Sequence, residues 1–301
     1  MSQPPIFIHI GMAKAASTFL QRACFPSWPV DDHHFNEKDL ELLVAESLDV
    51  DFFRQRFQHL TPGPRGTTLF TNELLSGSPP NVQQIYPYDP QQIARRLQHI
   101  YPSAKVLLII REQRSIILST YAFRTINKGF NSEPLAQFIA THREKMGDYY
   151  GYDRLIRSYG DLFGGENLLV LPYEWLSGDR ERFLNRMQAF MGISAPFPEE
   201  GERVNPSDKS RGYIDLCRML NRPLFQLFKL SGRNRNFGRR LHRFKQGPLQ
   251  KLVGVMPPAT RKPWQLDDGE LGELHRLFGE SNRRTEQLTG LDLKALGYLW
   301  E

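Results

Sequence analysis

The sequence has few cysteines and no long apolar run. Among its 301 residues only Cys24 and Cys217 are cysteines, so we expect no disulfide framework and a buried, structural role for each thiol. No stretch approaches the ~20 consecutive apolar residues of a membrane-spanning helix. The start of the sequence also lacks the positively charged region that precedes the apolar part of a signal peptide. We therefore expect a soluble, cytoplasmic protein.

Acidic residues are missing from one long segment. Between Arg218 and Lys251 the sequence has ten Lys or Arg and no Asp or Glu, whereas the rest has 29 basic and 33 acidic residues. The net charge of +6 therefore comes from this segment alone. Such a segment indicates either a solvated basic face or an anionic partner, which could be a nucleotide, a sulfated or phosphorylated glycan, a membrane surface or a nucleic acid.

Strand-like and helix-like segments alternate over the first 200 residues. Apolar runs typical of strands lie at residues 6–10, 67–71, 105–110 and 167–171. The third run, KVLLII, does not alternate, as expected of a strand buried on both faces of a parallel sheet. Helix-like segments lie at residues 17–24, 89–100, 114–126, 133–145 and 179–192, with Asp89 and Gly192 as caps. This order predicts an α/β fold with a mostly parallel sheet.

After about residue 200 the sequence becomes helical and basic. Apolar residues keep helical spacing from Tyr213 to Leu227, with a break or kink expected at Pro223, and a last helix is expected at about residues 269–288. We find no clear linker and expect one domain over residues 1–301. It would consist of an α/β core at residues 1–200 and a helical part at residues 201–301 packed on that core.

The stretch IFIHIGMAKAAST, residues 6–18, predicts an anion-binding loop. A strand leads through Gly11 into the start of a helix, whose first N–H groups lack backbone partners. Lys14 adds a cation, and Ser17 and Thr18 add hydroxyl groups. A Walker loop would place Gly-Lys-Ser/Thr in direct succession, whereas this lysine comes three residues after the glycine and three before the serine. The loop therefore suits a phosphate or sulfate but has the wrong order for a magnesium-nucleotide site.

A second motif, VLLIIREQRSIILSTY, places Arg111 at the carboxyl end of a buried strand. Ligands of open α/β sheets bind at that edge, and an arginine there can hold a phosphate through two hydrogen bonds. Ser119 follows two helical turns later. Taken alone, Arg111 could pair with Glu112 and Ser119 could be an ordinary helix serine. Together with the first loop, they indicate a phosphate site.

These motifs resemble those of sulfotransferases that use 3'-phosphoadenosine 5'-phosphosulfate (PAPS). AKAAST at residues 13–18 is similar to the family's 5'-phosphosulfate loop, and the Arg and Ser eight residues apart match its 3'-phosphate motif. LLVLPYEWL at residues 168–176 is similar to a Tyr-Glu pair after a strand, and the sequence at residues 281–298 is similar to the C-termini of bacterial, carbohydrate-type members. The resemblance implies a P-loop-like three-layer fold with a central, mostly parallel sheet flanked by helices.

The same resemblance implies the residues that hold the cofactor. They are Lys14, Ala15, Ala16, Ser17 and Thr18 for the 5'-phosphosulfate, Arg111 and Ser119 for the 3'-phosphate, Tyr173 near the adenine, and Arg211 of a late Arg-Gly pair for the 3'-phosphate. The family more commonly has Pro and Gly where this sequence has Ala13 and Ala16. We therefore expect ordinary backbone geometry at the start of the helix.

The implied reaction moves a sulfuryl group from PAPS to an acceptor and releases 3'-phosphoadenosine 5'-phosphate (PAP). Lys14 would stabilise the leaving phosphate, and Glu73, just after the second strand-like run, would act as general base. His33 and His34 are the alternative bases, although they lie in a polar segment that we expect to be a loop. We expect His9, inside the first strand-like run, to be a core histidine and not a catalytic residue. No metal-binding motif is present, and we expect no metal in the reaction.

A carbohydrate hydroxyl is the expected acceptor, and residues 26–66 and 77–89 are the expected acceptor loops. The basic segment 218–251 could hold an anionic or lipid-linked glycan at a membrane surface by peripheral contact. Two other functions stay open at this point. A small-molecule kinase would need a Walker lysine and a magnesium-binding acid. A nucleic-acid or membrane module without catalysis would show steep salt dependence, but Phe237 and Phe244 are too sparse for base stacking, so no nucleic acid is expected.

Overall fold

The computed structural model consists of two compact units. It describes residues 5–57, 65–80, 88–127, 131–198, 210–232, 235–253, 262 and 265–300. Unit 1 consists of Met1–Gln113, Glu144–Val204 and Leu274–Glu301, and unit 2 of Arg114–Arg143 and Asn205–Glu273. Unit 2 thus includes residues from before position 200, and unit 1 includes the C-terminal end. The expected single domain stays a prediction, and residues 58–64 and 81–87 of the expected acceptor loops lie outside the described residues.

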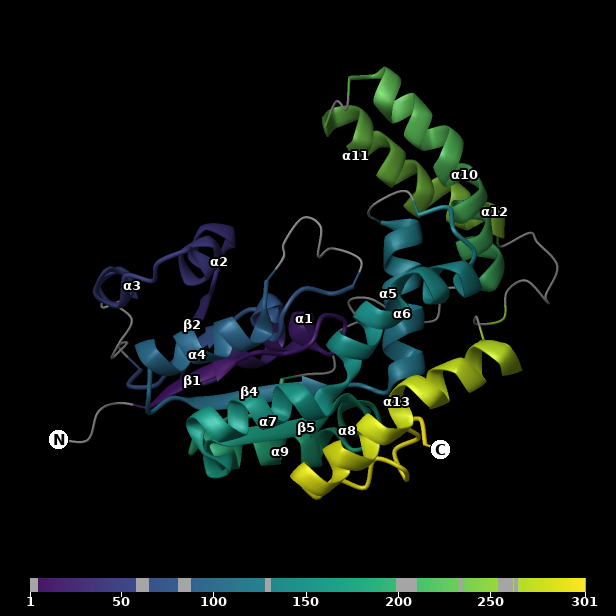
Figure 1. Ribbon diagram of the computed structural model, residues 1–301. Helices are drawn as coiled ribbons and strands as arrows, with labels where there is room; N and C mark the ends of the chain where they lie inside the picture. The colour runs from purple at the N-terminus through teal and green to yellow at the C-terminus, as the bar shows by residue number, and fades with distance from the viewer. Residues whose placement is uncertain are drawn as a thin grey trace. The chain divides into compact units, whose positions relative to one another are not determined.

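Unit 1 is built around a five-stranded sheet in which each neighbouring pair of strands is parallel. The strand order is β2-β3-β1-β4-β5. The bounds are β1 Ile6–His9, β2 Asp31–His34, β3 Thr68–Thr71, β4 Lys105–Ile110 and β5 Leu168–Pro172. Helices flank this sheet (Figure 1). The predicted α/β class, with a parallel central sheet flanked by helices, is confirmed.

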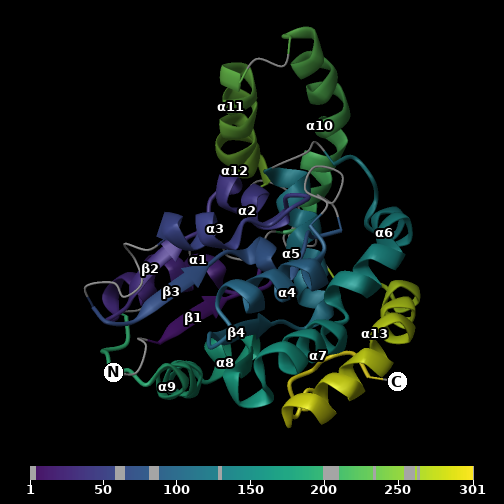
Figure 2. The same cartoon turned by 60° about the vertical axis from the view of Figure 1, so that its left-hand side comes forward.

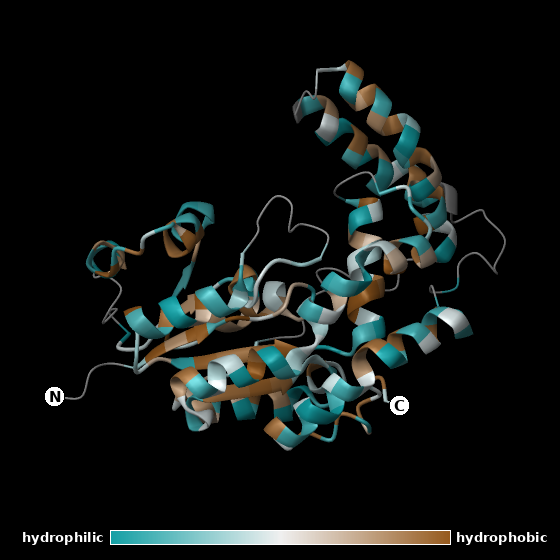
Figure 3. Cartoon of the chain, in the orientation of Figure 1, coloured by the Kyte–Doolittle hydropathy of each residue, from teal (hydrophilic) through white to brown (hydrophobic). Residues whose placement is uncertain are grey.

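The inner strands are apolar because both of their faces are covered. Every side chain of β3 is buried, and so is every side chain of β4 after Lys105. Figure 3 shows β4 mostly in brown, the colour of hydrophobic residues. On one face the ring of Phe7 packs edge-on against the ring of Phe190, with 6.1 Å between their centroids. The unbroken apolar run at residues 105–110 correctly predicted such a doubly covered strand.

The residues around His33 and His34, which we expected to form a polar loop, form strand β2. The strand pairs in parallel with β3, and His34 lies level with Thr71. Its side chains alternate between half-buried and exposed, since only one side of this edge strand is covered. On that side the ring of His33 lies 4.9 Å from the ring of Phe57. A strand built from Asp and His has no apolar run, so hydrophobic patterning missed it.

The helices of unit 1 agree with the sequence at several ends. Asp89 caps α4 by accepting a hydrogen bond from the Gln91 N–H at 3.0 Å, and Gly192 ends α9 in the left-handed conformation. The segment expected as one helix at residues 17–24 is a short α-helix followed by a π-helix. The helical elements are α1 Ser17–Phe19, η1 Leu20–Cys24, η2 Phe25–Ser27, α2 Glu37–Val44, α3 Val50–Phe57, η4 Glu73–Ser76, α4 Pro90–Ile100, α7 Tyr152–Phe163, η5 Gly165–Asn167, α8 Tyr173–Gly178 and α9 Arg180–Met191.

Unit 2 is helical in its described part. It contains most of α5 Gln113–Ile126, the start of α6 Leu135–Tyr150, α10 Arg211–Leu230, α11 Arg235–Phe244, η6 Lys245–Leu249, α12 Gln250–Val253 and the start of α13 Asp268–Thr289. The buried Asn221 side chain donates hydrogen bonds to the carbonyl groups of Thr125, at 2.8 Å, and Asn131, at 2.6 Å. Helix α10 continues through the exposed Pro223, so no break occurs there, and the kink expected as the alternative stays a prediction. Pro223 has no N–H group for the carbonyl of Met219, which is itself an exposed residue.

Both cysteines are free and buried, as expected. Burial raises the pKa of Cys24 to about 12, so this thiol stays neutral at physiological pH. Across the described ranges, no helix has the length and apolar character needed to span a bilayer.

Candidate active site

Polar residues of unit 1 follow the carboxyl ends of four neighbouring strands. Parallel strands end at one edge of the sheet, where open α/β sheets bind ligands. The register sets His9 of β1 level with Thr71 of β3, and Ile110 of β4 level with Pro172 of β5. The sequence-predicted residues at this edge are Lys14, Glu73, Arg111 and Tyr173. The fold therefore brings together four candidates that lie far apart in the chain.

The loop after β1 contains two left-handed residues that are not glycine. Lys14 has φ 71° and Ala16 has φ 64°. Each such residue costs about 1–2 kcal/mol relative to ordinary helical backbone. The prediction of ordinary helical backbone geometry at Ala16 is therefore wrong. Left-handed residues turn successive N–H groups toward one concave side, which is a geometry that binds anions.

Ala15, Ser17 and Thr18 complete this loop and the first turn of α1. Ala15 and Ser17 are buried, and Thr18 is half-buried. The Ala15 N–H and the Ser17 hydroxyl both donate to the Met12 carbonyl, at 3.1 and 3.4 Å. The loop is thus closed around Met12, while the first N–H groups of α1 have no partners inside the helix.

A buried histidine lies beneath the loop. The Nδ1 atom of His9 is 2.8 Å from the Thr71 hydroxyl, and no described residue forms a hydrogen bond with its Nε2 atom. Burial, with a smaller contribution from His34, lowers the pKa of His9 to about 3, so the ring is neutral. A Cβ atom at Gly11 would come within 2.4 Å of the His9 Nε2 atom. The position therefore requires glycine, and His9 is a core residue that supports the loop.

Lys14 lies among other charged groups. Burial is the largest influence and lowers the pKa of its ammonium group, while the Glu73 carboxylate raises this pKa and the Arg111 guanidinium lowers it further. Both neighbours act through their charges, and the Arg111 side chain also contacts the backbone of Lys14 by donating to its carbonyl at 2.9 Å. A cation and a carboxylate gathered at a ligand-binding edge can stabilise an anion and accept a proton, respectively.

Arg111 is buried with 8 % of its surface exposed, and several contacts hold it. Its Nη1 atom donates to the Lys14 carbonyl at 2.9 Å, and its guanidinium carbon lies 4.5 Å from the centre of the Tyr173 ring. The hydroxyl of Tyr152 donates to the Arg111 carbonyl at 2.5 Å. The Nε atom is buried, and no described residue accepts a hydrogen bond from it. Arg111 is thus positioned in advance and keeps one donor for an anionic ligand.

Glu174 stabilises the backbone directly after Arg111. One carboxylate oxygen accepts a hydrogen bond from the Glu112 N–H at 2.9 Å, and the other accepts one from the Tyr298 hydroxyl at 3.0 Å. Burial raises the pKa of Glu174, against the lowering effect of these two donors. The Tyr-Glu pair therefore has two roles here, since Tyr173 stacks on Arg111 while Glu174 fixes the adjacent backbone. The sequence led us to expect Tyr173 near the adenine, and it indicated neither of these two contacts.

Glu73 begins the 3-10 helix η4 directly after β3. Asn72 caps this helix by accepting from the Leu74 N–H at 2.7 Å, and its own amide donates to the Phe35 carbonyl at 2.6 Å. The Tyr149 hydroxyl lies 3.3 Å from the Ser76 hydroxyl of η4 and accepts from the Ala13 N–H at 3.4 Å. Tyr149 therefore links the Lys14 loop to the Glu73 segment. No sequence signal pointed to this residue, because only the folded chain brings it to the site.

The two alternative bases have different surroundings. His33 is half-buried among aromatic rings, and its Nε2 atom lies 3.6 Å from the Asp39 carboxylate. His34 is exposed at the end of β2, level with Thr71 and thus near the same sheet edge. His33 has the contacts of a structural residue, whereas His34 keeps its place as the alternative to Glu73.

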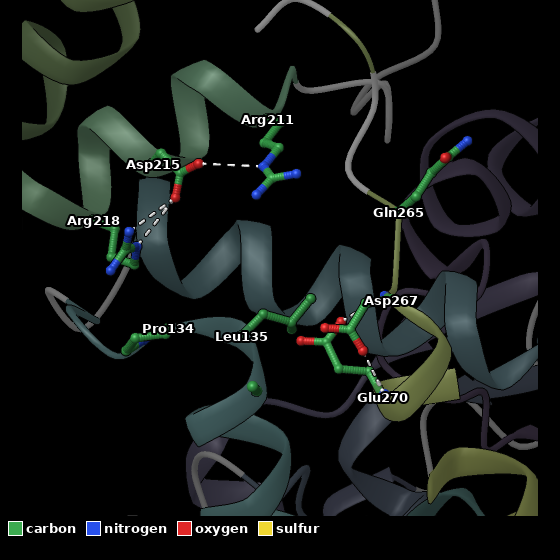
Figure 4. Close-up of a pocket in the computed structure, with 9 residues that line it drawn as sticks. Pro134, Leu135, Arg211, Asp215, Arg218, Gln265, Asp267 and Glu270 are labelled. Atoms are coloured by element: carbon green, nitrogen blue, oxygen red, sulfur yellow. Dashed lines mark hydrogen bonds and ion pairs between the residues drawn. The ribbon is translucent and has the colours of Figure 1, made fainter. Parts of the chain in front are cut away.

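Ser119 and Arg211 lie in unit 2, so their roles beside Arg111 stay predictions. Ser119 is half-buried on α5. Arg211 is exposed, and its Nε atom lies 3.7 Å from the Asp215 carboxylate. Together with Asp267 and Glu270 it lines a cavity of about 230 Å³ within unit 2 (Figure 4). The charge of Arg211 is thus partly balanced by acidic neighbours of its own unit.

Fold and site together define an α/β protein in which Lys14, Arg111 and Glu73 follow the carboxyl ends of a parallel sheet. A sequence model of the sulfotransferase family matches residues 24–199, which is more than half of the chain. This chain belongs to the sulfotransferase family and is an enzyme of sulfuryl transfer. The matched range includes Glu73, Arg111 and Tyr173 but starts after Lys14, so the role of the Lys14 loop depends on the geometry described above.

A solved sulfotransferase structure shares this fold, and two others align with it at lower TM-scores. The enzyme from Alicyclobacillus acidocaldarius superposes with a TM-score of 0.57 at 16% sequence identity, over 99% of this chain and 100% of that one. Mouse sulfotransferase SULT7A1 complexed with PAP gives a TM-score of 0.42 at 14% identity, over 81% and 90% of the two chains. The sulfotransferase domain from the curacin biosynthetic pathway gives 0.40 at 13% identity, over 100% of both. Among curated proteins, none matches the sequence.

Proposed function

We propose that this enzyme transfers a sulfuryl group from PAPS to a hydroxyl of a carbohydrate acceptor. The convergence of Lys14, Glu73 and Arg111 at one sheet edge carries this proposal, because sulfuryl transfer requires a cation at the leaving phosphate and a base at the acceptor. The influence of Glu73 and Arg111 on the pKa of Lys14 supports their proximity. The carbohydrate acceptor is supported by the similarity of residues 281–298 to carbohydrate-type members.

The residues at the edge fit PAPS by their chemistry. The loop at residues 14–18 would offer a 5'-phosphate the N–H groups at the start of α1 and the Thr18 hydroxyl, with the Ser17 hydroxyl turning from its long contact to Met12. The Nε atom of Arg111, which has no partner in the described chain, suits the 3'-phosphate. Tyr173 would lie near the adenine, and Ser119 and Arg211 are assigned to the 3'-phosphate by resemblance alone. When bound, PAPS supplies the activated sulfuryl group together with a phosphate leaving group.

Lys14 and Glu73 perform the two charge-dependent parts of the reaction. The Lys14 ammonium stabilises the negative charge that grows on the leaving phosphate, and its effect is stronger than in bulk water because the residue is half-buried. The Glu73 carboxylate accepts the proton of the acceptor hydroxyl, so that the oxygen attacks as a better nucleophile. Arg111 and Tyr173 hold their positions without reorganisation, since the Lys14 carbonyl and the Tyr152 hydroxyl already fix Arg111.

Binding and transfer assays test this proposal together. Calorimetric titration with PAP in the absence of magnesium should give saturable binding, and labelled PAPS with a panel of glycans, phenols and amines should label a glycan. Glu73→Gln should lower the transfer rate by about 100-fold or more while PAP binding is kept. The exposed Glu41→Gln variant is the matched control and should behave as the wild type.

Each part of the proposal has its own contradicting result. Labelling of phenols or amines in preference to glycans would overturn the carbohydrate acceptor but not the site. A fully active Glu73→Gln enzyme would move the base to His34, and the His34→Gln variant would then lose activity. Heat from ATP with magnesium and none from PAP would overturn the use of PAPS.

A further inference from the structure

Unit 2 has an exposed helical hairpin with an unusual surface. Helices α10 and α11 contact each other (Figure 2). The absence of a side chain at Gly238 allows this close packing, since a Cβ atom there would come within 3.2 Å of the Phe228 ring. The sequence from Leu216 to Leu266 contains no Asp or Glu. A catalytic role at the sheet edge does not explain this composition.

The exposed surface of α10 includes an apolar stripe, beside which Arg222, Gln226 and Lys229 are also exposed. Leu230 is 84% exposed, Met219 67% and Leu227 49%, and Pro223 is also exposed. These residues are spaced by three or four positions, so they share one face of the helix. Soluble proteins rarely leave such a continuous stripe of large apolar side chains in water unless it has a partner.

The neighbouring helix α11 is cationic on its exposed side. Arg239, Arg240 and Arg243 are exposed, and spacings of three and four place them on one side of the helix. None of the three forms an ion pair with any residue of the described chain. The end of α10 carries the leucines, and the middle and last turn of α11 carry the unpaired arginines, so both kinds of side chain lie on the same hairpin. We call residues 227–232 and 236–243 the hairpin tip.

We propose that the hairpin tip docks on a membrane surface rich in anionic lipid. A lipid surface matches both properties, since leucines enter the boundary of the acyl chains while arginines bind the phosphate headgroups. A nucleic acid or an anionic glycan would match the arginines but would leave Leu227 and Leu230 in water. A second protein copy would cover the leucines but would bring the arginines of two chains together. This docking would hold the enzyme where lipid-linked acceptors are found.

Sedimentation with vesicles tests the charge requirement. The wild-type enzyme should bind vesicles of phosphatidylglycerol and phosphatidylcholine and should bind pure phosphatidylcholine only weakly, with affinity falling as salt rises. The variant Arg239→Gln/Arg240→Gln/Arg243→Gln should bind the anionic vesicles about 100-fold more weakly, at roughly fivefold for each arginine. The matched control is Arg95→Gln/Arg157→Gln/Arg186→Gln, which removes three exposed arginines of unit 1 and should change binding by less than about threefold.

Substitution of the leucines separates a membrane from other anionic partners. Leu227→Ser/Leu230→Ser should lower vesicle binding by about tenfold or more, whereas binding to heparin or single-stranded DNA should not change. Both side chains are exposed, so circular dichroism and the melting temperature should stay as in the wild type. The proposal would be overturned if the hairpin triple variant and the unit 1 control triple variant lost vesicle binding equally. It would also be overturned if Leu227→Ser/Leu230→Ser bound vesicles as well as the wild type. So would a wild-type dimer in light scattering that the serine substitutions dissociate without any vesicle binding.

Discussion

The sheet edge of unit 1 and the hairpin of unit 2 are both cationic, but they keep their cations in opposite environments. Arg111 is buried and is fixed by a carbonyl group and an aromatic ring. Arg239, Arg240 and Arg243 are exposed and have no ion pair in the described chain. A buried charge is costly and is kept only where specific contacts compensate for its dehydration. The proposed function therefore gives the edge one anion in one orientation, whereas the proposed docking gives the hairpin a surface on which many weak, salt-screened contacts add up.

The largest expected effect is a loss of kcat on removal of the Lys14 charge at the sheet edge, which removal of the hairpin charges should not cause. Lys14→Ala should lower kcat by about 1000-fold, because a positioned charge at the leaving group is worth several kcal/mol in the transition state. The exposed Lys38→Ala variant is the control and should keep full activity. The triple arginine variant of the hairpin should also keep its kcat toward a soluble acceptor. A comparable loss of kcat in the hairpin variant would end the distinction between the two regions.

Arg111 tests whether the edge requires a guanidinium or only a positive charge. Arg111→Ala should weaken PAP binding by about 100-fold, since one strong charge-assisted contact is lost. Arg111→Lys should recover little of that affinity, because an ammonium group cannot stack flat on Tyr173 and lacks the fixed planar set of donors with which Arg111 can contact the Lys14 carbonyl and a phosphate together. Calorimetry with PAP measures both variants. Full recovery by lysine would show that the edge binds by charge alone, as we expect of the hairpin.

The environment of Lys14 also predicts a pH dependence. Because burial lowers the pKa of this ammonium group, its proton is lost at a lower pH than that of a free lysine. The value of kcat/KM should therefore fall on the alkaline side before pH 10.5 is reached, by about tenfold for each unit beyond the pKa. Lys14→Arg should be slower but should lose this alkaline limb, because a guanidinium stays protonated. An identical limb in both enzymes would assign the titration to another group.

Tyr149 predicts a smaller effect that acts through positioning. Its hydroxyl joins the Ala13 N–H to Ser76, and both contacts are long, at 3.4 and 3.3 Å. Tyr149→Phe should therefore lower kcat by only about fivefold and leave PAP binding within about twofold, at a stability cost near 1 kcal/mol. Tyr121→Phe is the control, since it removes a buried hydroxyl that donates to the Glu133 carbonyl. A stability loss with no change of kcat would make Tyr149 purely structural.

The sequence predicts what depends on local pattern and misses what depends on tertiary context. Four strands and most long helices follow from apolar periodicity, and Lys14, Glu73 and Arg111 follow from their places after strands. Strand β2 was missed because Asp31–His34 has no apolar run. The contacts of Tyr149 and Glu174 join residues far apart in the chain, so no short motif contains them.

Substitutions in the backbone of the Lys14 loop should have the smallest effect, which is a change in stability. They test Ala16, whose backbone geometry the sequence predicted wrongly. Ala16 has φ 64° whereas Ala15 has no positive φ, although the two alanines are adjacent. Ala16→Gly should stabilise the protein by about 1 kcal/mol, because glycine adopts left-handed backbone without the Cβ penalty. Ala15→Gly should destabilise it by roughly 0.5–1 kcal/mol through the greater freedom of the unfolded chain. Urea titrations measure both, and PAP binding should be kept in Ala16→Gly. Equal destabilisation by the two glycines would mean that Ala16 carries no strain, and that the loop binds its anion at a relaxed helix start like the one first expected from the sequence.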